Sequence, residues 1–343
     1  MKKITKNKYA NFYLNAADKL GVDYEIINEK IGLASVFNGK QRLDISSNVL
    51  GVNTQIGSSL SVNKVKTSLL LQEDNIPVPE FKSFTNKVKA AQYALMQLKQ
   101  KKSIVVKPTN SSLSIGITVD PTNQKQIKMA IAEAFKENST IMIERYITGK
   151  HYRITVLDNE IIAVTERLAS NVTGDGKNSL LKLIKEKNTL RGKLRLPLIS
   201  LRNKDHQFLK SNKIDLNKVY PAKINIILQL GCDLDIGGER KRIERETIPQ
   251  ENIELFIRAV KKLNLRFAGI DYISPNINIP FSESVTAINE INSAPDSDVH
   301  YRDTHPGNNY AAERIIEKIF NTKKEIRREL LHPILSPLRV LSV

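Results

Sequence analysis

The sequence is poor in cysteine and aromatic residues, and it has no long apolar run. Its 343 residues include a single cysteine, Cys232, no tryptophan, and only 6% Phe, Trp and Tyr. One thiol excludes a disulfide within the chain and makes a cysteine-based zinc site implausible. No segment reaches the roughly 18 apolar residues that a membrane-spanning helix needs. The basic N-terminus lacks the apolar core of a secretory signal, so we expect a cytoplasmic protein with no membrane contact.

Positive charge is the unusual property of the composition. Against 36 Asp and Glu stand 53 Lys and Arg, for a formal net charge of +17. Such a balance favours anionic partners, among them nucleotides, acidic metabolites and nucleic acid. The basic residues are spread along the whole chain, however, and no aromatic residues alternate with them as a base-stacking surface requires. Nucleic acid is therefore only a minor hypothesis.

The pattern of apolar residues predicts a mixture of helices and strands without internal repeats. Alternation on both sides of Asp158-Asn159 predicts a β-hairpin of residues 152–158 and 161–167. Helices are expected at residues 9–20, 63–74, 86–101, 123–137, 179–188, 204–212, 249–264 and 308–320. Further strands are expected at residues 24–27, 103–107, 141–143, 223–229, 267–273 and 285–291.

Two of these strands carry oxygen ligands. Residues two apart on a strand share a face, so Glu290 and Asn292 point the same way, and the preceding strand carries Asp271. Carboxylate and amide oxygens on neighbouring strands suit Mg²⁺ that bridges nucleotide phosphates. The alternative is that these residues face solvent on half-exposed strands. The flanking residues are apolar, and an unpaired carboxylate there would be costly.

A second candidate site is the segment after the strand at 103–107. Lys107 ends this strand, and a serine-rich loop then leads to Gly116. Backbone N–H groups and hydroxyls of such a loop can hold phosphate oxygens. Lys64 opens the helix at 63–74, where the helix dipole also favours an anion. Glu144 follows the strand at 141–143 and could bind an adenine amino group or a ribose hydroxyl. A flexible Ser-rich hairpin is the alternative interpretation of the loop.

Taken in order, these motifs resemble the ATP-grasp ligases. Within that superfamily the chain is most similar to the ATP-grasp domains of cyanophycin synthetase and of the bacterial bifunctional glutathione synthetase. The resemblance covers roughly residues 60–320, and a chance match of the ordered set is improbable. It is carried by residues 63–79, 105–119, 143–188, 267–273 and 288–295.

The resemblance implies an α+β, ATP-grasp fold, in which two α+β subdomains clasp ATP. It divides the chain into a small N-terminal α/β region (1–62), an ATP-grasp domain (63–330) and a tail (331–343). Within the domain we expect a lid at about 80–148 and a catalytic subdomain at about 149–330. The implied activity is an ATP-dependent carboxylate–amine ligase that works through an acyl phosphate. Its substrates would be amino acids or a small, acidic peptide, and a homo-oligomer stays open.

The resemblance also assigns roles to residues. The nucleotide would be bound by Lys64, Lys107, Ser111, Ser112, Ser114, Gly116, Glu144, Tyr146 and Ile147. Mg²⁺, or Mn²⁺ in its place, would be held by Asp271, Glu290 and Asn292. The catalytic arginines would be Arg153 and Arg167, for which a structural ion pair is the alternative. The substrate loop would contain Asn171, Gly174, Asp175, Gly176 and Lys177.

The chain departs from the family pattern in two places. Ser114 stands where relatives have glycine in the phosphate loop, which affects loop flexibility. Gln229 replaces an arginine of the relatives, and Asp233 replaces an asparagine. Either a cation among residues 240–242 takes over from the lost arginine, or the phosphoryl chemistry has changed. The alternative function is therefore a regulatory or scaffold protein that keeps the ATP-grasp fold and binds ATP without turnover.

Overall fold

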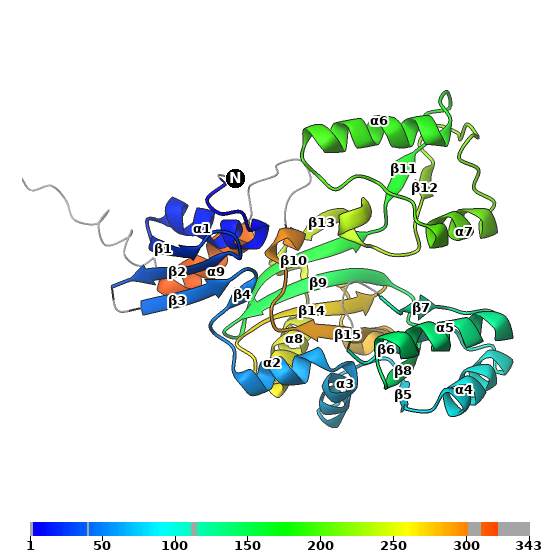
Figure 1. Ribbon diagram of the computed structural model, residues 1–343, viewed down its shortest axis with the longest axis horizontal. Coiled ribbons are helices and arrows are strands. Elements are labelled where there is room, and N and C mark those ends of the chain that lie inside the picture. Colours follow the sequence, from blue (N-terminus) through cyan, green and yellow to red (C-terminus); the bar gives the residue numbers. More distant parts are fainter. Residues whose placement is uncertain (1–2, 40, 111–114, 301–309, 322–343) are drawn as a thin grey trace, which may run out of the picture.

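A five-stranded antiparallel sheet forms the centre of the protein (Figure 1). The computed structural model describes residues 3–39, 41–110, 115–300 and 310–321. The predicted tail at 331–343 lies outside these ranges, as do Ser111, Ser112 and Ser114. The strand order is β13 (Glu239–Ile243), β10 (Glu160–Leu168), β9 (Lys150–Leu157), β14 (Phe267–Ser274) and β15 (Ala287–Asn292).

Local sequence determines the hairpin at the middle of this sheet. Strands β9 and β10 pair from Leu157 and Glu160 onward, and Asp158 and Asn159 form the turn between them. Both turn residues have left-handed backbones, with φ of 46° and 63°. Asp and Asn tolerate this conformation, and its twist matches the strands, so the predicted hairpin is confirmed.

One face of the central sheet is apolar and the other is polar. Helix α8 (Gln250–Lys262) packs against Tyr152, Ile154 and Val156 of β9 and against their neighbours on the adjoining strands. Because successive side chains of a strand point to opposite faces, Arg153 and Thr155 face away from α8. The alternation that builds the core thus presents the polar side chains on the other face.

A second sheet precedes the central one in the chain. Its order is β5 (Phe81–Phe84), β8 (Ile141–Arg145), β6 (Ile104–Pro108) and β7 (Thr118–Val119). Helices α4 (Lys87–Lys99) and α5 (Gln124–Glu137) pack on it. Ile127, Ile131 and Ala134 form the buried stripe of α5, and Phe135 is partly buried beside them. We call these elements, residues 81–145, the lid sheet.

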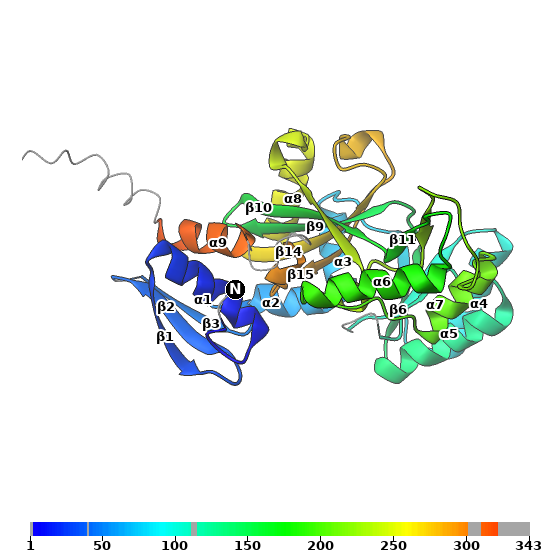
Figure 2. The same cartoon turned by 90° about the horizontal axis from the view of Figure 1, so that it is seen from above.

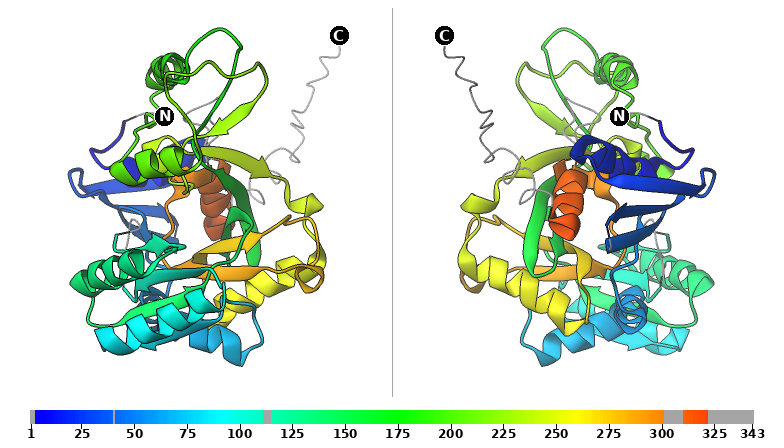
Figure 3. Two further views of the ribbon diagram at one scale, coloured as in Figure 1. Left: turned by 90° about the vertical axis from the view of Figure 1, so that its right-hand side faces the viewer. Right: turned by 90° about the vertical axis from the view of Figure 1, so that its left-hand side faces the viewer.

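The N-terminal region shares a core with the end of the chain. Helix α1 (Lys8–Leu20) contacts helix α9 (Tyr310–Phe320), which Figure 3 shows in red-orange beside the central sheet. Leu157 and Phe267 of the central sheet join the same core. A four-stranded sheet completes this region, with strands β1 (Asp23–Asn28), β2 (Leu33–Asn38), β3 (Gln41–Ser46) and β4 (Val49–Leu50). Figure 2 shows this region and the lid sheet at opposite ends of the molecule.

The remaining elements connect or extend these units. Helix α2 (Gln55–Val62), which the sequence pattern did not predict, runs directly into α3 (Lys64–Glu73). Strand β13 was not predicted either, because Glu-Arg-Lys-Arg-Ile shows no apolar alternation. An insertion between β10 and β13 carries α6 (Leu180–Lys193), α7 (Asn203–Ser211) and a two-stranded sheet of β11 (Asn171–Thr173) and β12 (Asn225–Ile227). Within the described ranges, no helix is long and apolar enough to cross a membrane.

Candidate active site

A buried ion pair joins two strands of the lid sheet. Val105 of β6 pairs with Glu144 of β8, so Lys107, two residues on, shares the face of Glu144. Lys107 Nζ lies 2.7 Å from Glu144 Oε1, and the two side chains are only 3% and 5% exposed. Burial raises the pKa of Glu144, although Lys107 opposes the shift. Among the described residues, Glu144 Oε2 has no hydrogen-bond partner, which leaves an acceptor for a ligand N–H or O–H.

Two residues of β15 connect the central sheet to Lys64 and Lys107. Lys107 Nζ donates to Asn289 Oδ1 over 3.3 Å, and Lys64 Nζ lies 3.1 Å from Glu290 Oε1. Strand pairing shifts here, since Asp271 opposes Glu290 while Tyr272 opposes Ile288. Asn289 is therefore the extra residue of a β-bulge. Simple alternation would have turned Asn289 away from the face of Glu290, which is why the sequence did not predict its contact.

The start of α3 explains why Lys64 is held there. The Asn63 side chain caps the helix by accepting from the backbone N–H groups of Val65 and Lys66, each at 3.1 Å. Lys64 is thereby fixed as the first helical residue, and its side chain is 5% exposed. The structure thus brings Lys64, Lys107, Glu144 and Glu290 together from segments far apart in the sequence.

Asp271 is shared by two arginines. Arg153 Nε lies 2.7 Å from Asp271 Oδ1, and Arg167 Nη2 lies 3.1 Å from Oδ2. Burial works against ionisation of Asp271, but Arg153 and Arg167 outweigh it and hold the pKa of this carboxyl below its ordinary value. The structural ion pair that was the alternative to a catalytic role of Arg153 and Arg167 is therefore present. Its carboxylate belongs to Asp271, which is also the predicted metal ligand.

Gly269 leaves space for one of these arginines. A Cβ at Gly269 would lie 2.5 Å from Pro295 Cβ and 2.7 Å from Arg153 Nη1.

Asn292 is the strand partner of Gly269, and Glu290 is the partner of Asp271. Asp271, Glu290 and Asn292 therefore occupy one face of two neighbouring strands, as their spacing predicted.

The oxygen ligands at this edge of the sheet fit a magnesium ion that is also coordinated by a phosphate. Among the described residues, no group of three or more His, Cys, Asp and Glu could hold a metal ion by itself. Asp271 and Glu290 supply two carboxylates, and Asn292 supplies an amide oxygen. Mg²⁺ prefers such hard oxygen ligands and usually keeps positions for phosphate oxygens and water.

A buried histidine lies behind the arginines. His300 is 1% exposed, and its ring nitrogens lie 2.7 Å from Thr155 Oγ1 and 2.9 Å from Thr165 Oγ1. Burial and the nearby arginines lower the pKa of His300 to about 3, so the ring is neutral at physiological pH. The sequence offered no signal for this residue.

Tyr146 and Ile147, two of the residues predicted to bind the nucleotide, adjoin the lid sheet. The Tyr146 N–H donates to Ser103 O over 2.9 Å, and Ile147 packs with Ile273 and Ala287. Gly116 has a left-handed backbone, with φ of 69°. These positions stay predictions for nucleotide binding.

The predicted substrate loop belongs to the insertion. Asp175 accepts from the N–H groups of Lys177 and Asn178 at 2.8 Å each, which forms a local turn and lowers the pKa of Asp175. Gly174 lies against the 220–224 backbone, and Gly176 has a left-handed φ of 75°. Asn171 donates to Glu239 Oε2 over 3.1 Å, next to β13. Their contacts explain the shape of this loop, and a role in substrate binding stays a prediction.

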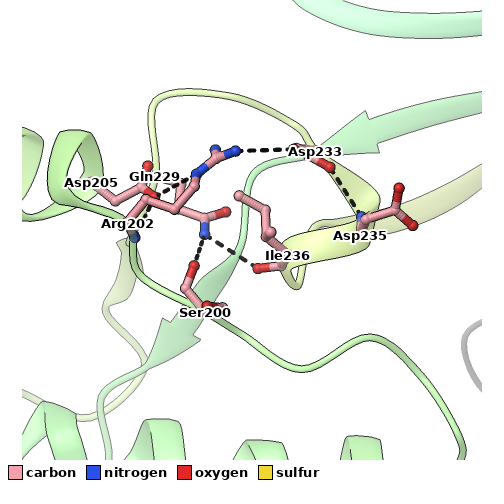
Figure 4. A network of polar contacts seen from close by, with 7 residues as sticks. All are labelled: Ser200, Arg202, Asp205, Gln229, Asp233, Asp235 and Ile236. Carbon is pink, nitrogen blue, oxygen red and sulfur yellow. Dashed lines mark hydrogen bonds and ion pairs between the residues drawn. The ribbon is translucent and has the colours of Figure 1, made fainter. Parts of the chain in front are cut away.

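Gln229 has a structural role in the same region (Figure 4). Its side chain is fully buried, and Nε2 donates to Ser200 O at 2.9 Å and Ile236 O at 3.2 Å. Nearby, Arg202 forms ion pairs with Asp205 and with Asp233, at 3.2 and 3.3 Å. Gln229 therefore joins two backbone segments and does not present a charge to the polar face of the sheet.

Comparison with known proteins finds relatives of this chain. Residues 70–177 match the family described as D-ala D-ala ligase C-terminus. The chain is 28% identical over 313 residues to the bifunctional glutathione biosynthesis protein GshAB of Clostridium perfringens, with 89% of this chain and 40% of that protein covered. It is 27% identical over 325 residues to cyanophycin synthetase of Trichormus variabilis, with 92% and 35% covered.

A crystal structure of a bifunctional glutathione synthetase from Pasteurella multocida shares the architecture. It superposes with a TM-score of 0.67 at 22% identity, over 93% of this chain and 44% of that one. The chain has the ATP-grasp fold. Both fold and resemblance are thus confirmed, while this ATP-grasp chain spans only about two fifths of the length of the curated relatives it matches.

Proposed function

We propose that this ATP-grasp protein is an ADP-forming carboxylate–amine ligase that joins amino acids or a small peptide through an acyl phosphate. The main support is the convergence of two buried lysines and two acidic residues from the lid sheet, α3 and β15. Buried lysines can stabilise phosphate groups, because they supply fixed positive charge in a site of low dielectric constant.

The reaction would proceed in two displacements. A carboxylate oxygen attacks the γ-phosphorus of ATP, the bond from this phosphorus to the β,γ-bridging oxygen breaks, and ADP leaves. The amine nitrogen then attacks the acyl carbon, the bond from carbon to the phosphate oxygen breaks, and the nitrogen loses a proton. Phosphoryl transfer depends mainly on positioning and charge neutralisation, which are the properties that this site offers.

Each group has a separate task in this proposal. Lys64 and Lys107 would bind phosphate oxygens. Glu144 Oε2, which has no hydrogen-bond partner among the described residues, would accept from the adenine or ribose. Arg153 and Arg167 would hold the reacting carboxylate. Asp271, Glu290 and Asn292 would hold Mg²⁺, which lowers the negative charge of the phosphates when bound. Lys64 is paired with Glu290, and Asp271 is paired with Arg153. Binding of the phosphate and the metal ion would displace these partners.

The decisive experiment measures ADP and phosphate release with Mg·ATP and pools of amino acids and acidic peptides. We expect release that requires both a carboxylate and an amine and that is lost in Glu290→Gln. Glu283→Gln is the matched control, because Glu283 is exposed and lies outside the site. Equal activity of these two variants would contradict the proposed metal ligand.

The regulatory or scaffold function rests on one observation. Gln229 replaces the cation of the relatives with a buried neutral amide that holds backbone. This alternative predicts tight ATP binding with no ADP release from any pool. The same assay therefore separates the two functions when equilibrium ATP binding is measured beside it.

A further inference from the structure

Strand β15 presents two consecutive polar side chains on one face. Ile288 and Ile291, three residues apart, both pack in the apolar core against α8. In a regular strand, side chains three residues apart point to opposite faces, so one residue between them must be extra. The strand pairing shifts between Ile288 and Glu290, which leaves Asn289 without a partner on β14. Asn289 and Glu290 therefore both lie on the polar face.

These two side chains contact different lysines. Glu290 pairs with Lys64 of α3, and Asn289 Oδ1 accepts a hydrogen bond from Lys107 Nζ of the lid sheet over 3.3 Å. The backbone N–H of Lys64 donates to Thr109 O over 3.0 Å, which connects the start of α3 to the residue after β6. The bulge is thus the point at which the central sheet contacts both lysines.

Lys107 is held by two contacts of different kinds. Glu144 on the neighbouring strand β8 lies 2.7 Å away and balances the charge of the lysine, whereas Asn289 accepts from another sheet and adds no charge. An ammonium group has three donors, and these two contacts use two of them. No other acceptor contacts Lys107 Nζ in the part of the chain that the structure describes, so the third donor is left for a ligand.

A neutral acceptor at position 289 suits the binding of an anion. The lysine side chain is long and flexible, and a single partner leaves the direction of its other two donors undetermined. A second acceptor on a different sheet fixes that direction. A carboxylate in place of Asn289 would put a second negative charge beside one lysine and would oppose the approach of a phosphate. The amide supplies the oxygen without this charge.

We propose that Asn289 is a positioning residue that holds the Lys107 ammonium group for a phosphate oxygen of the nucleotide. The inference rests on the nucleotide-binding role that the proposed function gives to Lys107, and it adds a residue for which the sequence predicted no role. Asn289 acts through Lys107 and contacts neither the nucleotide nor the metal ion. Because Asn289 belongs to β15, its contact also fixes Lys107 relative to the neighbouring Glu290.

The test compares the binding of ADP with that of adenosine, because only ADP carries phosphates. Calorimetry measures both ligands on the wild type and on Asn289→Leu, which keeps the approximate size of the side chain and removes the acceptor. We expect the Kd of ADP to rise about tenfold, as for the loss of one hydrogen bond to a charged group, and by the same factor with and without Mg²⁺. The Kd of adenosine should change little. The urea midpoint should also stay close to that of the wild type, because Asn289 is only half-buried.

Asn203→Leu is the matched control, because it makes the same substitution at an exposed residue of α7. Equal ADP binding by the Asn289→Leu and Asn203→Leu proteins overturns the inference. An equal loss of adenosine binding overturns it too, since the substitution would then damage the whole nucleotide site. An effect that appears only with Mg²⁺ would make Asn289 a metal ligand and likewise contradicts the positioning role.

The outcome for Asn289 is separate from the outcome for the ligase. Binding of ADP requires no turnover, so a protein that binds ADP but releases none from ATP refutes only the proposed ligase function. A wild type that binds neither ATP nor ADP refutes both. Where turnover is found, Asn289→Leu should raise the KM of ATP and leave the KM of the carboxylate and of the amine nearly unchanged.

Discussion

The ion pair between Lys107 and Glu144 allows a quantitative test of the lid sheet. Replacing Lys107 by methionine keeps the aliphatic stem and removes the ammonium group that lies 2.7 Å from Glu144 Oε1. The variant then contains an uncompensated carboxylate in a side chain that is 5% exposed. Breaking one partner of a buried pair costs about 3–5 kcal/mol, which is a large part of the stability of a typical domain.

The size of this effect follows from desolvation. Replacing both partners by apolar side chains removes the charge instead of isolating it, so Lys107→Met/Glu144→Leu should be more stable than Lys107→Met alone. Because the two residues touch, their effects should be clearly non-additive in a double-mutant cycle. Lys89→Met in the same lid sheet controls for the loss of one positive charge, since Lys89 is exposed on α4.

Urea unfolding at several pH values provides the assay. Burial already raises the pKa of Glu144, and loss of Lys107 removes the opposing effect. A raised folded-state pKa means that the folded variant keeps a proton which the unfolded chain has released. Its stability is therefore fully present below the unfolded pKa and is lost as pH rises through the folded one. The deficit against Lys89→Met should be smaller at about pH 5 than at about pH 8.

Two results would refute this reasoning. One is a Lys107→Met protein as stable as Lys89→Met at neutral pH, which would mean that Glu144 is hydrated or paired elsewhere. The other is a deficit that does not depend on pH. Loss of ATP binding without loss of stability would indicate a ligand contact for Lys107 and no structural pairing.

Three further changes test other parts of the site. Asp271→Asn should abolish ADP release. Its free energy of unfolding should also fall less with decreasing pH than that of the wild type, because the lowered pKa of Asp271 gives stability that is lost as pH falls. An equal loss of stability with pH in both proteins would contradict this. Gly269→Ala should cost about 1–3 kcal/mol in urea unfolding, because its Cβ would lie 2.7 Å from Arg153 Nη1. Gly231→Ala, with nothing within 4 Å, should be neutral. Gln229→Arg should lower the melting temperature without raising turnover, since the amide is fully buried and bonded to backbone; a faster enzyme would refute this.

Local patterns were sufficient for the parts of the fold that depend on neighbouring residues. The β9–β10 hairpin follows from alternation and from two residues that tolerate a left-handed turn, and the stripe on α5 follows from helical periodicity. Strand β13 has no apolar alternation because it is an edge strand whose residues are half-exposed or exposed. Its place beside β10 depends on a pairing across more than 70 residues, which no local pattern encodes.

By itself, the sequence determined the order of the motifs and the face on which each strand residue lies, because side-chain direction in a strand is a local property with a period of two. That was enough to place Asp271, Glu290 and Asn292 together. Only the tertiary structure decided which charges meet, because the partners belong to distant segments. The bulge at Asn289, the pairing of Lys64 with Glu290 and the position of Arg240 opposite Arg167 arise from packing and strand pairing between such segments.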